Sequence, residues 1–223
     1  ERVAALMRGS GIRNPMQTLN LLRSLPNTGD EARYVFNALG KNGSILVGED
    51  ATEEQFRSIF LGDYRYIHLA THGLIREELP GLTEAALVFT PGPSTDPSND
   101  GLLTASEIAD LSLNADVAVL SACNTATFED NYFLSETQGL TTAFAIAGVP
   151  STVVTLWPVE TISSEQLVTR FFDTLSSDAV TSAMALARAK RAFLVTSERP
   201  YQHPRFWASF VAYGNSAPNN GAG

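Results

Sequence analysis

The stretch V-A-V-L-S-A-C-N-T-A, Val117–Ala126, decides the fold of this chain. Its first residues are apolar and rich in valine and leucine, which is typical of a strand buried on both faces. The run ends at Ser121 and Ala122, and Cys123, the only cysteine of the chain, comes next. In an open parallel sheet, chemistry takes place just beyond the carboxyl ends of the strands. Cys123 is therefore either a small buried apolar residue or a nucleophile.

A second apolar run, Tyr66–Ala70, ends in the polar corner Thr71-His72-Gly73. His68 lies within the run and alternates with apolar neighbours, as expected of a hydrogen-bonded histidine on one face of a sheet. His72 lies past the strand end, 123 − 72 = 51 residues before Cys123. In caspases a similar spacing of about 50 residues separates the histidine from the nucleophilic cysteine. The two strand ends therefore predict a Cys–His dyad.

Helical patterns alternate with the apolar runs. Capping boxes predict helices that start at Thr28–Glu31, Thr52–Gln55, Thr104–Glu107 and Ser135–Gln138. Two further helices are expected over 164–175 and 178–196, and strands over 44–48, 66–70, 85–90, 117–121, 151–156 and 206–212. Phe56, Ile59 and Phe60 are expected on the inner face of the second helix. This order predicts one mostly parallel sheet that holds all the strands, with helices on both faces.

Composition narrows the class of protein. The chain has 223 residues, a formal net charge of −9 and 44% hydrophobic residues, which is typical of a globular protein with a substantial core. The acidic balance and the absence of basic clusters argue against nucleic acid or an anionic membrane as a partner. No apolar run is long enough to span a bilayer, and no secretory leader opens the chain. A single free thiol suits a reducing compartment, and we expect a cytoplasmic protein.

The chain resembles the CHAT domain, a caspase-like peptidase domain related to separase and the gingipains and often joined to tetratricopeptide repeats. The resemblance rests on segments spread over nearly everything after Leu25. These are L-P-N-T-G-D-E-A at 25–32, V-G-E-D-A-T-E-E at 47–54, H-L-A-T-H-G at 68–73, L-S-A-C-N-T-A at 120–126, L-W-P-V at 156–159 and H-P-R-F-W-A-S-F at 203–210. It implies a caspase-like three-layer α/β sandwich and a cysteine endopeptidase.

In that chemistry Cys123 is the nucleophile, and His72 accepts its proton and then protonates the leaving amine. The resemblance implies that the backbone amides of Gly73 and Cys123 form the oxyanion hole. No third catalytic residue is expected. No cofactor or metal is expected either, because the cysteine and histidines lack the spacing of metal ligands.

Substrate selection is expected beside the L-W-P-V-E segment, Leu156–Glu160. The corresponding segment of separase carries acidic residues that help to select arginine. Here Trp157 would form a pocket wall, Ser121 its floor, and Glu160 is the nearest acid in sequence, which predicts cleavage after arginine. The alternative is that Glu160 is a solvated acid that precedes Ser163 and caps the helix that follows.

Two features leave a second function open. Relatives usually carry Gly-Glu-Gly where this chain has Ser135-Glu136-Thr137, and the chain does not begin with methionine. The protein is therefore either a peptidase controlled by a partner or by an attached repeat region, or a catalytically weak caspase-like scaffold. We expect residues 1–24 to be a truncated part of the same domain, 25–214 the CHAT domain and 215–223 a disordered tail. The loop 91–101 is either a rim of the cleft or an ordinary surface loop.

Overall fold

The computed structural model describes residues 19, 22, 25, 27–79, 81–93, 96–121, 132–157, 159–177 and 180–215. The expectations for Cys123, for the loop after it and for most of the two terminal segments fall outside these residues.

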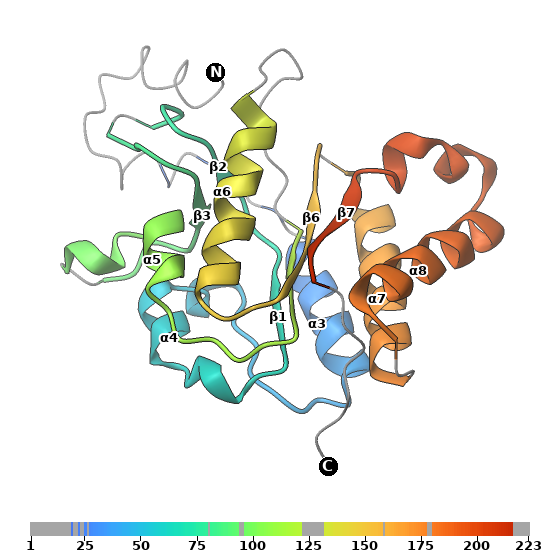
Figure 1. Cartoon of the computed structure of the whole chain (residues 1–223), viewed down its shortest axis with the longest axis horizontal. Helices are drawn as coiled ribbons and strands as arrows, with labels where there is room; N and C mark the ends of the chain where they lie inside the picture. The colour runs from blue at the N-terminus through green and yellow to red at the C-terminus, as the bar shows by residue number, and fades with distance from the viewer. Residues whose placement is uncertain are drawn as a thin grey trace.

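A four-stranded sheet forms the centre of the molecule (Figure 1). Its strands are β1 (Tyr66–Leu69), β5 (Val117–Leu120), β6 (Ser151–Thr155) and β7 (Phe210–Gly214), and they lie in the order β1-β5-β6-β7. The first three are parallel, whereas β7 runs antiparallel to β6. The mostly parallel central sheet is as predicted.

Helices cover both faces of this sheet, as Figure 1 shows. One face carries α3 (Thr28–Ala38), α7 (Thr161–Ser177) and α8 (Ser182–Thr196), and the other carries α4 (Glu53–Ser58), α5 (Ala105–Ala109) and α6 (Tyr132–Ile146). Side chains of β5 alternate between the two layers, so that Val117 and Val119 join one apolar cluster while Ala118 and Leu120 join the other. The caspase-like three-layer sandwich is confirmed.

The prediction that all strands share one sheet is wrong. Three short antiparallel strands form a second sheet: β2 (Gly73–Leu74), β3 (Ala86–Val88) and β4 (Leu102–Thr104). The chain turns after β1, and β2 then pairs with β3, the next strand along the chain. This sheet buries its own apolar cluster, which includes Leu74, Leu79 and Leu102.

In the described part of the chain, five short 3₁₀ helices connect these elements: η1 (Gly48–Asp50), η2 (Leu61–Asp63), η3 (Pro97–Asn99), η4 (Arg199–Gln202) and η5 (Pro204–Phe206). Because η5 contains Phe206, the final strand begins at Phe210 rather than at the predicted Phe206. Helix α6 begins at Tyr132 rather than at the predicted box Ser135–Gln138, and α8 begins at Ser182.

Two of the four predicted capping signals act as caps. The hydroxyl oxygen of Thr52 accepts the Gln55 amide at 3.2 Å, and Thr104 forms a complete capping box with Glu107. The box at Thr28–Glu31 is wrong: Thr28 is the first helical residue, and its hydroxyl donates to the Leu25 carbonyl at 2.7 Å. Glu31 instead turns into the core, where only 1% of its surface is exposed.

Two further predictions on this side of the molecule are wrong. The segment 44–48 joins no strand ladder, and it lines the same cavity as β1. Phe60 is 75% exposed, since α4 ends at Ser58 and the chain leaves the helical path before the side chain could turn inward.

The turn from α6 into β6 depends on Gly148. Its φ of 110° lies in the left-handed region, and the Val149 amide donates to the Phe144 carbonyl at 2.9 Å, which closes the helix. A Cβ at Gly148 would lie 2.3 Å from the carbonyl oxygen of Leu113. That carbonyl cannot withdraw easily, because the Leu113 amide is itself bound to the Ala147 carbonyl at 2.8 Å.

We expect Gly148→Ala to lower the free energy of unfolding by about 2 kcal/mol or more, from backbone strain and from the close contact. Urea denaturation measures the loss. Gly139→Ala in the same helix is the matched control. An added Cβ meets nothing within 4 Å there, so this change should raise stability by about 0.5–1 kcal/mol. Equal transition midpoints for the two variants would contradict this account of the turn.

Candidate active site

Three parallel strands bring candidate residues to one edge of the sheet. His72 follows β1, Ser121 follows β5 and Trp157 follows β6. The strand ends are in register, since Leu69 lies opposite Leu120 and Leu120 opposite Val154. The Ser121 amide continues the ladder by donating to the Leu69 carbonyl at 3.0 Å. Cys123, two residues after Ser121 in sequence, lies outside the described residues.

The backbone at His72 and Gly73 is held by the second sheet. The carbonyl of His72 accepts the Val88 amide at 2.9 Å, and Gly73 pairs with Leu87. The hydroxyl of Thr71 donates to the carbonyl of Val88. The corner after β1 is therefore fixed between two sheets, which suits a position where a histidine and a backbone amide must keep a set geometry.

A cavity of about 530 Å³ runs along the outer edge of β1. Its lining includes both His68 and His72, with Arg33, Ser44 and Tyr64 among the polar residues on its other sides. Among the described strands β1 pairs only with β5, so the cavity borders an edge that no strand covers. The His72 end of β1 thus has open space beside it.

Glu31 does not act in the capping box that the sequence predicts but hydrogen-bonds to a buried histidine. Its Oε1 lies 2.8 Å from Nε2 of His68, and its Oε2 accepts the hydroxyl of Ser164 at 2.8 Å. The same Nε2 is 3.3 Å from Oγ of Ser121. A signal for this cluster was present in the sequence, because a histidine on the buried face of a strand requires a hydrogen-bonding partner.

The carboxylate of Glu31 is stabilised in its charged form. Burial raises its pKa, but the hydrogen bond and charge of His68 and the hydroxyls of Ser121 and Ser164 outweigh burial. Together they hold the pKa of Glu31 below its ordinary value of 4.5. Its hydrogen-bond partners come from β1 and α7, and the His68 nitrogen also contacts Ser121 at the end of β5, while Glu31 itself belongs to α3. One buried group thus joins four elements beneath the sheet edge.

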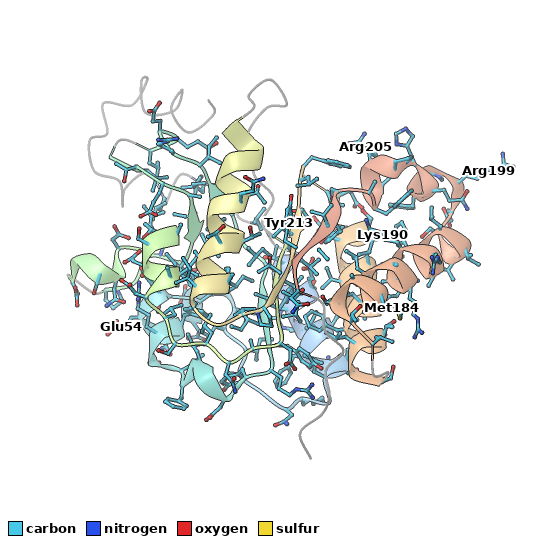
Figure 2. The ribbon with its side chains drawn as sticks, in the orientation of Figure 1. Glu54, Met184, Lys190, Arg199, Arg205 and Tyr213 are labelled. Atoms are coloured by element: carbon cyan, nitrogen blue, oxygen red, sulfur yellow. The ribbon has the colours of Figure 1, made fainter. Side chains whose placement is uncertain are left out.

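Trp157 and Glu160, the other two predicted pocket residues, follow β6, which lies on the other side of β5 from β1. The indole Nε1 of Trp157 donates to the Arg205 carbonyl at 3.0 Å, which attaches this tryptophan to η5. Figure 2 labels Arg205 there, beyond the end of β6. Glu160 is exposed, and its Oε2 accepts the Ser163 amide at 3.1 Å at the start of α7. This is the capping geometry that the sequence left open as the alternative to a pocket role.

A family model described as CHAT domain matches residues 5–215. The chain belongs to the CHAT domain family. Tetratricopeptide repeat protein 28 of Homo sapiens is 29% identical over 233 residues, which cover 88% of this chain and 9% of that protein. Its counterpart in Mus musculus is 28% identical over 230 residues, with the same coverage of 88% and 9%. The chain thus spans about a tenth of the length of these relatives.

Membership in the CHAT domain family agrees with the caspase-like sandwich, and the relatives' names agree with the association of this domain with tetratricopeptide repeats. Within the described ranges, no group of three His, Cys, Asp or Glu side chains is arranged to hold a metal ion. None of the described helices combines the length and the apolar character that a membrane span requires.

We expect the stabilising effect of Glu31 to depend on pH. Its pKa is lower in the folded protein than in the unfolded chain. The contribution is therefore complete above the ordinary value of 4.5 and is lost as the pH falls through the lowered pKa. At pH 7, Glu31→Gln should lower the free energy of unfolding by about 3 kcal/mol, because His68 and the Ser164 hydroxyl lose a charged partner.

Urea denaturation across a pH series measures the difference between wild type and Glu31→Gln, which should shrink in acid. Asp30→Asn is the control: its side chain is 61% exposed and pairs with Arg33 at the surface, so a small effect is expected. A difference that stays constant from pH 7 to acid would refute the assignment of a charged Glu31.

Proposed function

We propose that this chain is a cysteine endopeptidase that uses a dyad of His72 and Cys123 and cleaves a protein substrate after a basic residue. The observation that carries the proposal is the register of β1 with β5. It sets the end of β1 beside the end of β5, and in the sequence His72 is three residues past Leu69 while Cys123 is three residues past Leu120. Family membership supports the same chemistry, because the CHAT domain is related to caspase-like peptidases.

The reaction proceeds through an acyl-enzyme. His72 takes the thiol proton, and the thiolate of Cys123 attacks the scissile carbonyl carbon. The amides of Gly73 and Cys123 stabilise the oxyanion, the C–N bond breaks, and His72 gives its proton to the leaving amine. Water then hydrolyses the thioester with His72 as the base, which releases the acid product and regenerates the thiol. Ser121 forms the pocket floor, Trp157 a wall, and an acid selects the basic residue, with Glu160 the nearest one in sequence.

Regulation by a repeat region or partner is part of the proposal. Relatives over this stretch are named for tetratricopeptide repeats, and the chain corresponds to a small part of them. A free thiol on Cys123 suits a reducing compartment such as the cytoplasm.

A catalytically weak scaffold is the second candidate function. One observation favours it: α6 runs as regular helix through Ser135–Thr137, where relatives usually carry Gly-Glu-Gly. Two glycines would allow backbone conformations at the start of that segment that serine and threonine disfavour. The dyad residues, both retained, favour the enzyme.

We expect Cys123→Ala and His72→Ala each to abolish peptide cleavage, with far-ultraviolet circular dichroism unchanged. The double variant should be little worse than either single one, because the two side chains act as a unit. Turnover of a fluorogenic peptide library measures the effect, and intact mass after reaction with a peptidyl electrophile shows whether Cys123 is labelled.

His68→Gln serves as the control for the dyad, since a glutamine amide can still donate toward Glu31. It should lose stability and retain turnover. Near-normal cleavage by Cys123→Ala, with contaminating protease excluded, would contradict the proposed mechanism. If Cys123 is labelled to the same extent in wild type and in His72→Ala, the scaffold function would be favoured.

Activity of the isolated chain is expected to be low and to rise when the natural flanking sequence is restored. A comparison of kcat/KM between this chain and a longer version that contains the preceding region provides the measurement. Equal, high turnover by both proteins would argue that regulation lies elsewhere.

A further inference from the structure

We propose that the cavity beside β1 receives one extended segment of polypeptide, which pairs with the open edge of β1 as a further strand of the central sheet. The region that precedes this chain in the longer protein supplies the segment. Because the cavity also borders His72, the inference deepens the regulation of the proposed peptidase and, for its effect on turnover, rests on that function. The pairing itself does not depend on catalysis.

The backbone on the outer side of β1 is open to pairing. Successive residues of a strand direct their amide and carbonyl groups to opposite sides of it. The carbonyls of Arg65 and Leu69 accept amides from the side of β5, at 2.7 and 3.0 Å. Tyr66 and His68 alternate with them and therefore face the cavity side. Within the described chain, no hydrogen bond reaches the backbone of these two residues, and such an edge is a template for another strand.

A second stretch of backbone along the cavity also lacks a strand partner. The sequence predicts a strand over 44–48, and Val47 has the extended backbone of one, with φ −141° and ψ 150°. None of the described strands pairs with this segment, which lines the same cavity as β1. Its far end is held in place, because the Gly48 carbonyl accepts the hydroxyl of Thr90 at 2.7 Å. An inserted segment would supply the neighbour that this strand pattern lacks.

The cavity has the position of a strand within the sandwich. Its lining includes Ala32 from α3 and Phe56 from α4, and these helices cover opposite faces of the sheet (Figure 1). It therefore lies in the layer of the sheet, where a strand finds apolar contacts on both of its faces. β1 has four residues, which corresponds to about 13 Å at about 3.3 Å per residue. A segment of similar length would match this edge.

The lining of the cavity indicates the chemistry of the segment. Most of the lining is apolar, and its described residues include no aspartate or glutamate, although the chain has a net charge of −9. Its basic residues are Arg33, His68 and His72. A lysine or arginine entering the cavity would find no carboxylate to pair with, and burying an unpaired charge is costly. We therefore expect a segment rich in valine, isoleucine and leucine.

The chain reaches this cavity from its N-terminal side. Leu19, Leu22 and Leu25, the first described residues, line it. The preceding region therefore has the shortest connection to the open edge of β1. The relatives show that a flanking region can be long, because this chain covers only 9% of them. A strand placed in the cavity would also pack beside His72, which connects the pairing to the proposed base.

Amide hydrogen exchange, followed by NMR at single residues, tests the pairing without any need for activity. In this chain alone, the amides of Ile67 and Leu69, which face β5, should be protected, while those of Tyr66 and His68 exchange faster. In a longer version that contains the preceding region, exchange at Tyr66 and His68 should slow by about 100-fold or more relative to Ile67 and Leu69. In the same protein, kcat/KM for a peptide should rise by about tenfold.

Ala32→Trp tests whether the cavity is the binding site, because Ala32 lines it and an indole would occupy the space. In the longer protein, this change should return both the turnover and the exchange at Tyr66 and His68 to the values of this chain alone. Asn37→Trp is the matched control, since Asn37 is exposed on the same helix and does not line the cavity. It should behave as wild type. Where Ala32→Trp fails to fold, the exchange comparison in the wild-type sequence decides the outcome.

Three results overturn the inference. The amides of Tyr66 and His68 could already be as protected as Ile67 and Leu69 in this chain alone, or they could gain no protection in the longer protein. Protection that appears in this chain alone as its concentration rises would identify a second copy as the occupant instead.

The inference and the proposed function fail in different ways. Added protection in a protein that cleaves no peptide, and whose Cys123 no peptidyl electrophile labels, overturns the proposed function and leaves the strand pairing. Cleavage without added protection overturns the strand pairing and leaves the peptidase.

Discussion

A single buried carboxylate, that of Glu31, constrains the relative positions of four elements. A charged group leaves water only when hydrogen bonds replace its hydration. Glu31 finds these donors on His68 in β1 and on Ser164 in α7, and the same His68 nitrogen lies 3.3 Å from Oγ of Ser121 at the end of β5. Each donor must stay within hydrogen-bonding distance, so α3 cannot slide against the sheet or α7 without leaving a buried charge unsatisfied. The apolar clusters fill the space between the layers, and this polar cluster fixes the position of α3 relative to the sheet and α7.

The strand ends at the edge of the sheet are also held in fixed positions. Beneath it, the Glu31 cluster holds the last described residue of β5, and beside it the second sheet holds the backbone of His72 and Gly73. Trp157 is tied to η5 at the end of β6. Three strand ends are thus held by three different sets of contacts. A peptidase of this kind needs such an arrangement, because its nucleophile, base and oxyanion donors come from separate segments.

Much of the fold and part of the candidate site could be predicted from the sequence, because the signals for them are local. The buried strand at Val117–Leu120, the strand before His72 and the caps at Thr52 and Thr104 follow from patterns only a few residues long. Glu31 could not be assigned in this way. Thr28-Gly-Asp-Glu31 satisfies the capping pattern, but partners 37 and 133 residues away, His68 and Ser164, decide where the carboxylate goes. The predicted strand at 44–48 does not form for a related reason. A strand requires a neighbouring strand to pair with, and local composition does not reveal whether one is present.

The most direct test of the account is a crystal structure of the protein after reaction with a peptidyl-arginine electrophile. The account predicts a thioether to Sγ of Cys123, with His72 beside it and the guanidinium in a pocket formed by Ser121 and Trp157. Failure to form the adduct at Cys123, or an adduct from which the His72 side chain lies far away, would contradict it.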